Sequence, residues 1–211
     1  MIRVVVADDH TIVREGLKQL LAAAGDIEVV GEANDGHGVM ERVRGTEFDV
    51  LLLDMSMPGK SGIELIKQVR AEKPKLRMLV LSMHEEHQYA VRAIKSGASG
   101  YLTKESASSQ LVAALRKVAA GGAFISAEVA QQLALSAMPD ADKQPHESLS
   151  DREFQVFRLL ALGRTVSEIA LELHVSAKTV STHKARLQEK MGLGSQAELV
   201  RYALAHRLID Q

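Results

Sequence analysis

Four short apolar segments in the first half of the chain each end in side chains that could hold or accept a phosphoryl group. The segments 2–7, 50–53, 78–81 and 100–103 lead, in this order, into Asp8-Asp9, Asp54, Ser82 and Lys104. Adjacent carboxylates repel one another unless a cation is present, and oxygen ligands beside a phosphate favour Mg²⁺. A carboxylate can attack phosphorus when a metal ion and an ammonium group neutralise the charge of the transferred group. These residue types therefore predict phosphoryl chemistry on an aspartate, provided that the fold brings them together.

The apolar segments themselves indicate how the chain positions these groups. Short, nearly continuous apolar runs are typical of strands buried on both faces, and such strands form parallel sheets covered by helices. Helices are predicted at 11–24, 36–44, 61–72, 86–96 and 108–120. We therefore expect an α/β doubly wound, flavodoxin-like fold with five parallel strands in the order 2-1-3-4-5. The first and third strands are then neighbours, so their aspartates meet at the carboxyl edge. Lys104 lies two strands from Asp54, about 10 Å away, which its long side chain largely spans.

Composition limits the classes of protein to which the chain can belong. Its 211 residues and hydrophobic fraction of 46% leave room for one large domain or two small ones. The absence of cysteine excludes disulfides and thiolate metal sites. No apolar stretch approaches the length of a membrane span, and Met1 leads directly into a strand, so we expect a cytoplasmic protein with no membrane partner. The net charge of −1 does not itself predict a nucleic-acid partner. Any such partner must bind a local basic patch.

The pattern changes after residue 120, where strand signals end. Residues 121–147 are predicted to be a linker with one short helix at 127–137, because 138–146 is polar, aperiodic and holds two prolines. Residues 148–211 contain three capping boxes, which begin at Ser150, Thr165 and Ser195, and glycines where helices are predicted to end. We therefore expect an α/β domain at 1–120, a linker at 121–147, and a small all-α domain of four helices at 148–211.

One helix of the second domain, predicted at 176–191, has the charge distribution of a nucleic-acid contact. Its residues 176–190 carry four basic side chains against one acidic side chain, although 148–211 as a whole has 9 Lys and Arg against 7 Asp and Glu. Val180, Leu187 and Met191 share an apolar face at helical spacing. The opposite face holds Lys178, Ser181, Thr182, Ala185 and Arg186. Such a helix, about 22 Å long, fits the major groove of DNA. The aromatic content of 3% disfavours base stacking on single-stranded RNA.

Four motifs of the first domain together carry a family resemblance. They are Val-Ala-Asp8-Asp9-His, Leu-Leu-Asp54-Met-Ser-Met-Pro58-Gly, Leu-Ser82-Met-His and Gly-Tyr101-Leu-Thr-Lys104. In this combination residues 1–120 resemble the receiver domain of two-component response regulators. The resemblance implies that Asp54 accepts a phosphoryl group from the phosphohistidine of a sensor histidine kinase. It implies that Asp9, Asp54 and the Ser56 carbonyl bind Mg²⁺, with Asp8 acting through water. Ser82 and Lys104 would contact the phosphoryl oxygens, and Ser82 and Tyr101 would form the pair whose reorientation signals phosphorylation.

The second domain carries a resemblance of its own, in Leu149-Ser-Asp-Arg-Glu153, Gly163-Arg-Thr-Val-Ser-Glu-Ile-Ala170 and Val175-Ser-Ala-Lys-Thr-Val-Ser-Thr-His183. These motifs are similar to those of a LuxR-type helix-turn-helix. The resemblance implies that base edges of double-stranded promoter DNA are contacted by Lys178, Ser181, Thr182 and Ala185, and phosphates by Lys184, Arg186 and Lys190. The last helix, predicted at 196–207, is apolar on more than one side, which indicates a homodimer contact. The two resemblances imply a phosphorylation-dependent DNA-binding transcriptional regulator of the NarL/FixJ type, not an enzyme.

Two alternative functions remain open from the residues alone. An aspartyl-phosphate hydrolase of the haloacid-dehalogenase kind also uses an aspartate at a strand end, but it has Asp-x-Asp at its first strand, where Asp8 and Asp9 are adjacent here. A phosphorylation-switched protein-binding adaptor would keep the first domain without DNA binding by the second. The segment His84-Glu-Glu-His87 resembles a zinc motif, but its histidines are only three residues apart and follow a strand, so we do not expect zinc there.

Overall fold

The computed structural model describes residues 1–57, 62–82, 87–136, 144–206 and 208–209. The chain divides into two compact units, Met1–Gln131 and Gln132–Gln211, and the division falls within helix α6 (Ala127–Ser136). The limits given above for the linker remain a prediction. Among the described helices, none combines the length and the apolar character that crossing a membrane requires.

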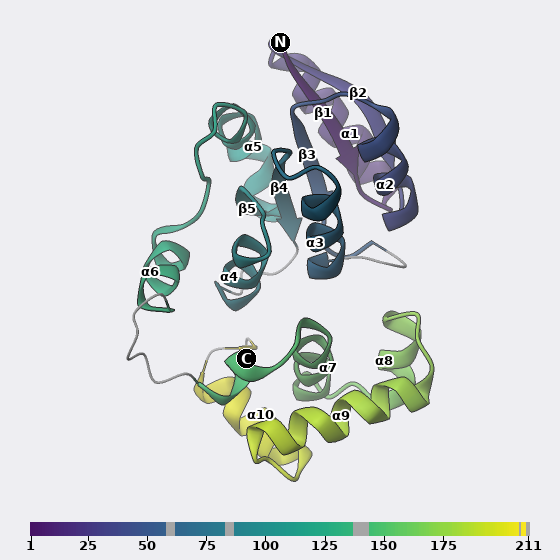
Figure 1. The fold of residues 1–211 in the computed structure, drawn as a ribbon, viewed down its shortest axis with the longest axis vertical. Coiled ribbons are helices and arrows are strands. Elements are labelled where there is room, and N and C mark those ends of the chain that lie inside the picture. Colours follow the sequence, from purple (N-terminus) through teal and green to yellow (C-terminus); the bar gives the residue numbers. More distant parts are fainter. Residues whose placement is uncertain (58–61, 83–86, 137–143, 207, 210–211) are drawn as a thin grey trace. The chain divides into compact units, whose positions relative to one another are not determined.

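The first unit is built on one parallel sheet of five strands. These are β1 (Ile2–Ala7), β2 (Ile27–Ala33), β3 (Val50–Asp54), β4 (Arg77–Ser82) and β5 (Gly100–Thr103). Their order is β2-β1-β3-β4-β5, so β2 and β5 lie at the two edges (Figure 1), and the predicted order is confirmed. The connecting helices are α1 (Thr11–Ala23), α2 (Gly36–Gly45), α3 (Gly62–Glu72), α4 (His87–Lys95) and α5 (Lys104–Ala119).

The continuous apolar runs of the sequence form the centre of this sheet. All five residues of β3 are buried, as the burial of both faces of a central parallel strand requires. On one face, alternate residues of β1 such as Val4 and Val6 join a core cluster with Leu21 of α1 and Leu111 of α5. This packing fixes the sheet order, and the order in turn decides which strand ends lie side by side.

The described residues of the second unit form helices and turns but no strand, in agreement with the predicted all-α domain. A single 3₁₀ turn (Pro145–Ser148) precedes α7 (Asp151–Ala161), α8 (Val166–Glu172), α9 (Ala177–Met191) and α10 (Gln196–Ala205). The capping boxes predicted at Ser150, Thr165 and Ser195 are all formed, with each hydroxyl accepting from the main chain three residues later and each glutamate bonding back. Helix α9 ends at Met191, and Gly192 follows it with a φ of 65°, the left-handed conformation that glycine adopts most easily.

Two local expectations differ from the structure. Helix α5 begins at Lys104 and not at Ser108, because the Thr103 hydroxyl accepts a hydrogen bond from the Ser106 main-chain N–H and caps the helix earlier. Residues 145–147, expected within the linker, form a 3₁₀ turn together with Ser148. His146 in this turn is buried, and its Nδ1 lies 2.9 Å from the Tyr202 hydroxyl. Ser61, the predicted first residue of the third helix, and His84 of the zinc-like segment lie outside the described residues.

Candidate functional site

The carboxyl ends of the central strands bring the predicted acidic residues together. Asp8 follows β1 directly and Asp54 is the last residue of β3, and both are fully buried. Strands β1 and β3 are paired up to Ala7 and Leu53, so the two aspartates emerge side by side. The neighbouring strand β4 brings the buried Ser82 to the same edge. Three polar groups are thereby held at one rim by strand pairing alone.

Lys104 reaches this rim from the far edge of the sheet. Its Nζ lies 2.8 Å from Asp8 Oδ2 and 3.0 Å from Asp54 Oδ2, so one ammonium bridges two buried carboxylates. The early start of α5 places Lys104 in the first helical turn, directly after β5. The sequence predicted that this side chain would cross much of the gap, and the structure shows that it crosses all of it.

Burial and the charge of the ion-pair partner shift the pKa values of Asp54 and Lys104 in opposite directions. Burial raises the pKa of Asp54, which the nearby Lys104 ammonium opposes and the Asp8 carboxylate reinforces, and the net pKa lies above the usual aspartate value. Burial by itself would lower the pKa of Lys104, but the Asp8 and Asp54 carboxylates outweigh it and the pKa is raised. Lys104 is therefore held charged, and further positive charge beside Asp54 would favour its carboxylate form.

The same rim offers a set of donor atoms suited to a divalent cation. Asp8, Asp9, His10 and Asp54 each contribute one atom, all within 4.8 Å of one another. Within the described residues, Asp9 Oδ1 and Asp54 Oδ2 are buried and accept no well-aligned hydrogen bond, although Asp54 Oδ2 keeps its ion pair with Lys104. Buried oxygens of this kind are costly unless a partner satisfies them. The oxygen-rich donor set fits a hard cation such as Mg²⁺.

His10 is the member of this group that the sequence analysis missed. Its Nδ1 lies 3.0 Å from Asp9 Oδ1 and 3.3 Å from Asp8 Oδ1, and its main-chain N–H donates to Asp8 Oδ1. The available signal was its position, since it directly follows two predicted cation ligands. The imidazole is 61% exposed, so it lies at the mouth of the pocket.

Ser56 and Tyr101 have different relations to the pocket. The Ser56 main-chain N–H donates to Asp54 Oδ1 at 3.2 Å, which places its main chain beside the carboxylate. Tyr101 lies on β5, opposite Val80 of β4 and three residues before Lys104, and is only 8% exposed. The fold thus brings Asp8, Asp9, Asp54, Ser56 and Lys104 together and leaves Tyr101 on the flank of the sheet.

In the second unit, α9 presents the predicted two faces. Val180, Leu187 and Met191 are buried against the unit's own core. The side chains predicted to meet DNA are exposed at Lys178, Ser181, Thr182, Ala185, Arg186 and Lys190 and partly exposed at Lys184. The Thr182 hydroxyl donates to the Lys178 carbonyl at 2.9 Å, so its oxygen remains available outward as an acceptor. Exposed polar groups and cations in this arrangement can meet a polyanion without any change in the core.

Lys190 differs from the other cations of α9. Its Nζ lies 2.7 Å from Oε2 of Glu153, a nearly buried side chain on α7 that also completes the Ser150 capping box. Burial by itself would raise the pKa of Glu153, but Lys190 and the Ser150 main chain outweigh it, and the pKa is lowered. Lys190 therefore joins the end of α9 to the start of α7 inside this unit.

Comparisons with known proteins agree with both halves of this description. A model of the response regulator receiver domain matches residues 4–116, and a model of bacterial regulatory proteins of the luxR family matches residues 147–203. Response regulator UvrY of Escherichia coli K12 is 36% identical over 211 residues, covering 100% of this chain and 97% of the relative. Response regulator GacA of Pseudomonas aeruginosa is 37% identical over 211 residues, covering 100% and 99%.

A solved structure extends the agreement to three dimensions. RcsB from Salmonella enterica serovar Typhimurium, bound to promoter P1flhDC in the presence of the phosphomimetic BeF3−, matches with a TM-score of 0.66 and 30% identity, covering 95% of this chain and 97% of that one. The sheet order, the helical second unit and the two matched families point the same way. The chain belongs to the response regulators of the NarL/FixJ type, transcriptional regulators that join a phosphorylation-controlled receiver domain to a LuxR-type DNA-binding domain.

Proposed function

We propose that Asp54 accepts a phosphoryl group from the phosphohistidine of a sensor histidine kinase, and that this modification controls DNA binding by α9. The observation that carries the proposal is the Lys104 ammonium between the buried carboxylates of Asp8 and Asp54. A positive group held at this point can stabilise the negative charge that develops on a transferring phosphoryl group. No other carboxylate of the pocket contacts an ammonium among the described residues.

The transfer exchanges one bond to phosphorus for another. An oxygen of the Asp54 carboxylate attacks phosphorus, the phosphorus–nitrogen bond to the imidazole breaks, and its electron pair returns to the ring, leaving an aspartyl phosphate. Lys104 and the Ser82 hydroxyl then bind phosphoryl oxygens. Asp8, Asp9, Asp54 and the Ser56 carbonyl would hold Mg²⁺, which supplies charge neutralisation at the reacting oxygens when bound.

For the second domain, we infer that α9 is the recognition helix. Lys178, Ser181, Thr182 and Ala185 would meet base edges in the major groove, and Lys184 and Arg186 would bind phosphates. Lys190 would join the phosphate contacts with a second N–H of its ammonium while it keeps its ion pair with Glu153. The RcsB structures include dimers bound to DNA, which supports a homodimer of this chain on promoter DNA. The exposed Leu204 on α10, at 38%, is available to such a contact.

Labelling with a small acyl phosphate tests the phosphoryl site. The full chain should take up the group in the presence of Mg²⁺ and lose uptake on its removal. Asp54→Asn should abolish labelling, whereas Asp49→Asn, an exposed position just before the start of the same strand, should label normally. Retained labelling of Asp54→Asn would refute the site. Steady release of phosphate from phosphate esters would instead favour the hydrolase, and failure to retard any duplex at low salt would favour the adaptor.

A further inference from the structure

The segment after α5 returns to the sheet and lengthens its β5 edge. The Phe124 N–H donates to the Ser99 carbonyl at 3.2 Å, and the Tyr101 N–H donates to the Phe124 carbonyl at 2.8 Å. Phe124 also forms a parallel bridge with Gly100. We call residues 122–129 the strap. An edge strand exposes unpaired main-chain groups, and the strap occupies them at the strand that carries Tyr101 and leads into Lys104.

The strap is held by the packing of Phe124 and of Val129 and by its close approach to Gly100. The Phe124 ring packs against the core cluster of the sheet and lies under the Lys117 ammonium, 5.8 Å from its centroid. Val129 is 3% exposed, and its N–H donates to the Ser126 hydroxyl at the start of α6. At Gly100 a Cβ would lie 2.9 Å from Leu79 Cδ1 and 3.0 Å from the Phe124 carbonyl oxygen, so the absence of a side chain here lets both β4 and the strap approach closely. The contact is built from both sides.

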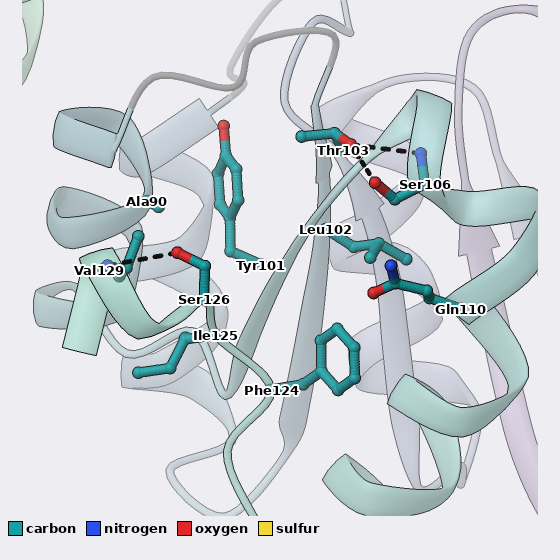
Figure 2. Close-up of a pocket in the computed structure, with 10 residues that line it drawn as sticks. All are labelled: Ala90, Tyr101, Leu102, Thr103, Ser106, Gln110, Phe124, Ile125, Ser126 and Val129. Atoms are coloured by element: carbon teal, nitrogen blue, oxygen red, sulfur yellow. Dashed lines mark hydrogen bonds between the residues drawn. The ribbon is translucent and has the colours of Figure 1, made fainter.

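The strap also walls a cavity of about 370 Å³ beside the Tyr101 ring. Figure 2 shows the ring on the α4 side, near Ala90, with its hydroxyl pointing away from Phe124. Thr103 and Ser106 of the β5–α5 corner line the opposite side, and the strap contributes Phe124, Ile125, Ser126 and Val129. Because Tyr101, Thr103 and the strap line the same cavity, a shift of Tyr101 or Thr103 changes the packing of the strap.

The pocket gives a reason for such a shift. In this structure Lys104 contacts the Asp54 carboxylate directly, and the strap is docked on β5. A phosphoryl group on Asp54 stands between the two side chains, and the ammonium must move outward to reach its oxygens. Lys104 directly follows Thr103, the last residue of β5. Its displacement therefore pulls on a strand of only four residues, and the strap is bonded at the start of that strand, at Ser99, Gly100 and Tyr101.

We propose that the strap is a phosphorylation-controlled contact: it docks on β5 while Asp54 is unmodified and loosens when Asp54 carries a phosphoryl group. The proposal rests on phosphorylation at Asp54 as proposed above. It gives the chain a direct route from the pocket to α6, the helix that leads onward to the DNA-binding unit. Because coupling between two equilibria is reciprocal, loosening the strap must favour the phosphorylated form by the same factor.

Amide hydrogen exchange of the full chain, followed by NMR with and without beryllium fluoride and Mg²⁺, tests the forward direction. The amides of Phe124 and Tyr101 should exchange about fivefold faster or more with the phosphoryl mimic. The Val5 amide in central strand β1 should not change. Unchanged exchange at Phe124 and Tyr101, in a sample whose fluorine spectrum shows the adduct, overturns the strap proposal alone. Absence of any adduct overturns the phosphorylation site and the strap with it.

The reverse direction uses variants of the strap. Phe124→Ala removes the ring that holds it, so the apparent affinity for beryllium fluoride should rise about fivefold or more. A purely structural role would lower that affinity or leave it unchanged, and either result contradicts the proposal. Gly100→Ala places a Cβ 3.0 Å from the Phe124 carbonyl oxygen, as well as 2.9 Å from Leu79 Cδ1, so it presses on the strap from β5 and should act likewise if Phe124→Ala does not fold. Leu135→Ala, on an exposed part of α6, is the control and should bind as the unmodified chain does.

Discussion

The acidic pocket and the basic face of α9 handle charge in opposite ways. In the pocket, Asp8 and Asp54 are fully buried and Lys104 nearly so, so each charge depends on its neighbours. On α9, side chains such as Lys178 and Arg186 are exposed and screened by water and salt. A change of one charge therefore has a large electrostatic effect in the pocket. On α9, by contrast, binding would be the sum of many weak contacts. This contrast suits a switch in one domain and a reader of DNA in the other.

The largest effect is expected at Lys104. Lys104→Met keeps the apolar stem but leaves Asp8 and Asp54 as buried carboxylates without their ammonium, which should cost about 3 kcal/mol of unfolding free energy in the absence of Mg²⁺. Urea unfolding of the full chain, followed by far-UV circular dichroism, measures the loss. Added Mg²⁺ should recover part of it, because the cation neutralises the same carboxylates. Equal loss with and without Mg²⁺ would contradict the cation site.

A smaller effect is expected from Lys178 on the exposed face. Lys178→Ala should weaken binding to a specific duplex by about 1–2 kcal/mol, roughly tenfold, without lowering the unfolding midpoint. Lys184→Ala, which removes a predicted phosphate contact, should reduce the slope of log affinity against log salt by about 1. Gel retardation across a salt series separates the two. If either variant also unfolds more readily, its side chain belongs to the packing of the unit and not to the DNA surface.

The smallest effect is expected at Glu153, which is nearly buried and forms an ion pair with Lys190 in the second unit. Its pKa is lowered in the folded protein, so the pair adds stability above the ordinary pKa of 4.5, and this stability is lost as pH falls through the lower folded value. Glu153→Gln should cost about 1 kcal/mol at pH 7. Thermal unfolding at successive pH values should show the difference between variant and parent shrinking below pH 4.5. A difference that persists unchanged in strong acid would contradict this assignment.

The sheet and the pocket followed from the sequence because parallel strands end at a shared edge. The apolar runs located the strands, and their last residues located Asp8, Asp54 and Ser82 without any knowledge of packing. The start of α5 was misplaced at Ser108 because that residue is also a good helix cap, and propensity does not distinguish it from Thr103. His10 was overlooked because a single histidine has no periodic pattern.

Other features depended on contacts between elements and were beyond pattern analysis. Charge spacing grouped Lys190 with the other cations of α9, whereas its partner Glu153 lies on a helix distant in sequence. His146 looked like part of an irregular linker, and only packing under α10 shows it to be buried. The return of Phe124 to the edge of β5 has no local signal either, because one residue pairs where a strand would need several.

The double role of Glu153 has a further consequence for how DNA is approached. The Glu153 carboxylate caps the first turn of α7 and also pairs with Lys190 in the last turn of α9. It therefore fixes the two helices relative to each other. The tilt of α9, the proposed recognition helix, is thereby set from its carboxyl end. A substitution at this remote point should alter the angle of insertion into the groove, and hence which base pairs are discriminated, while every contacting side chain stays the same.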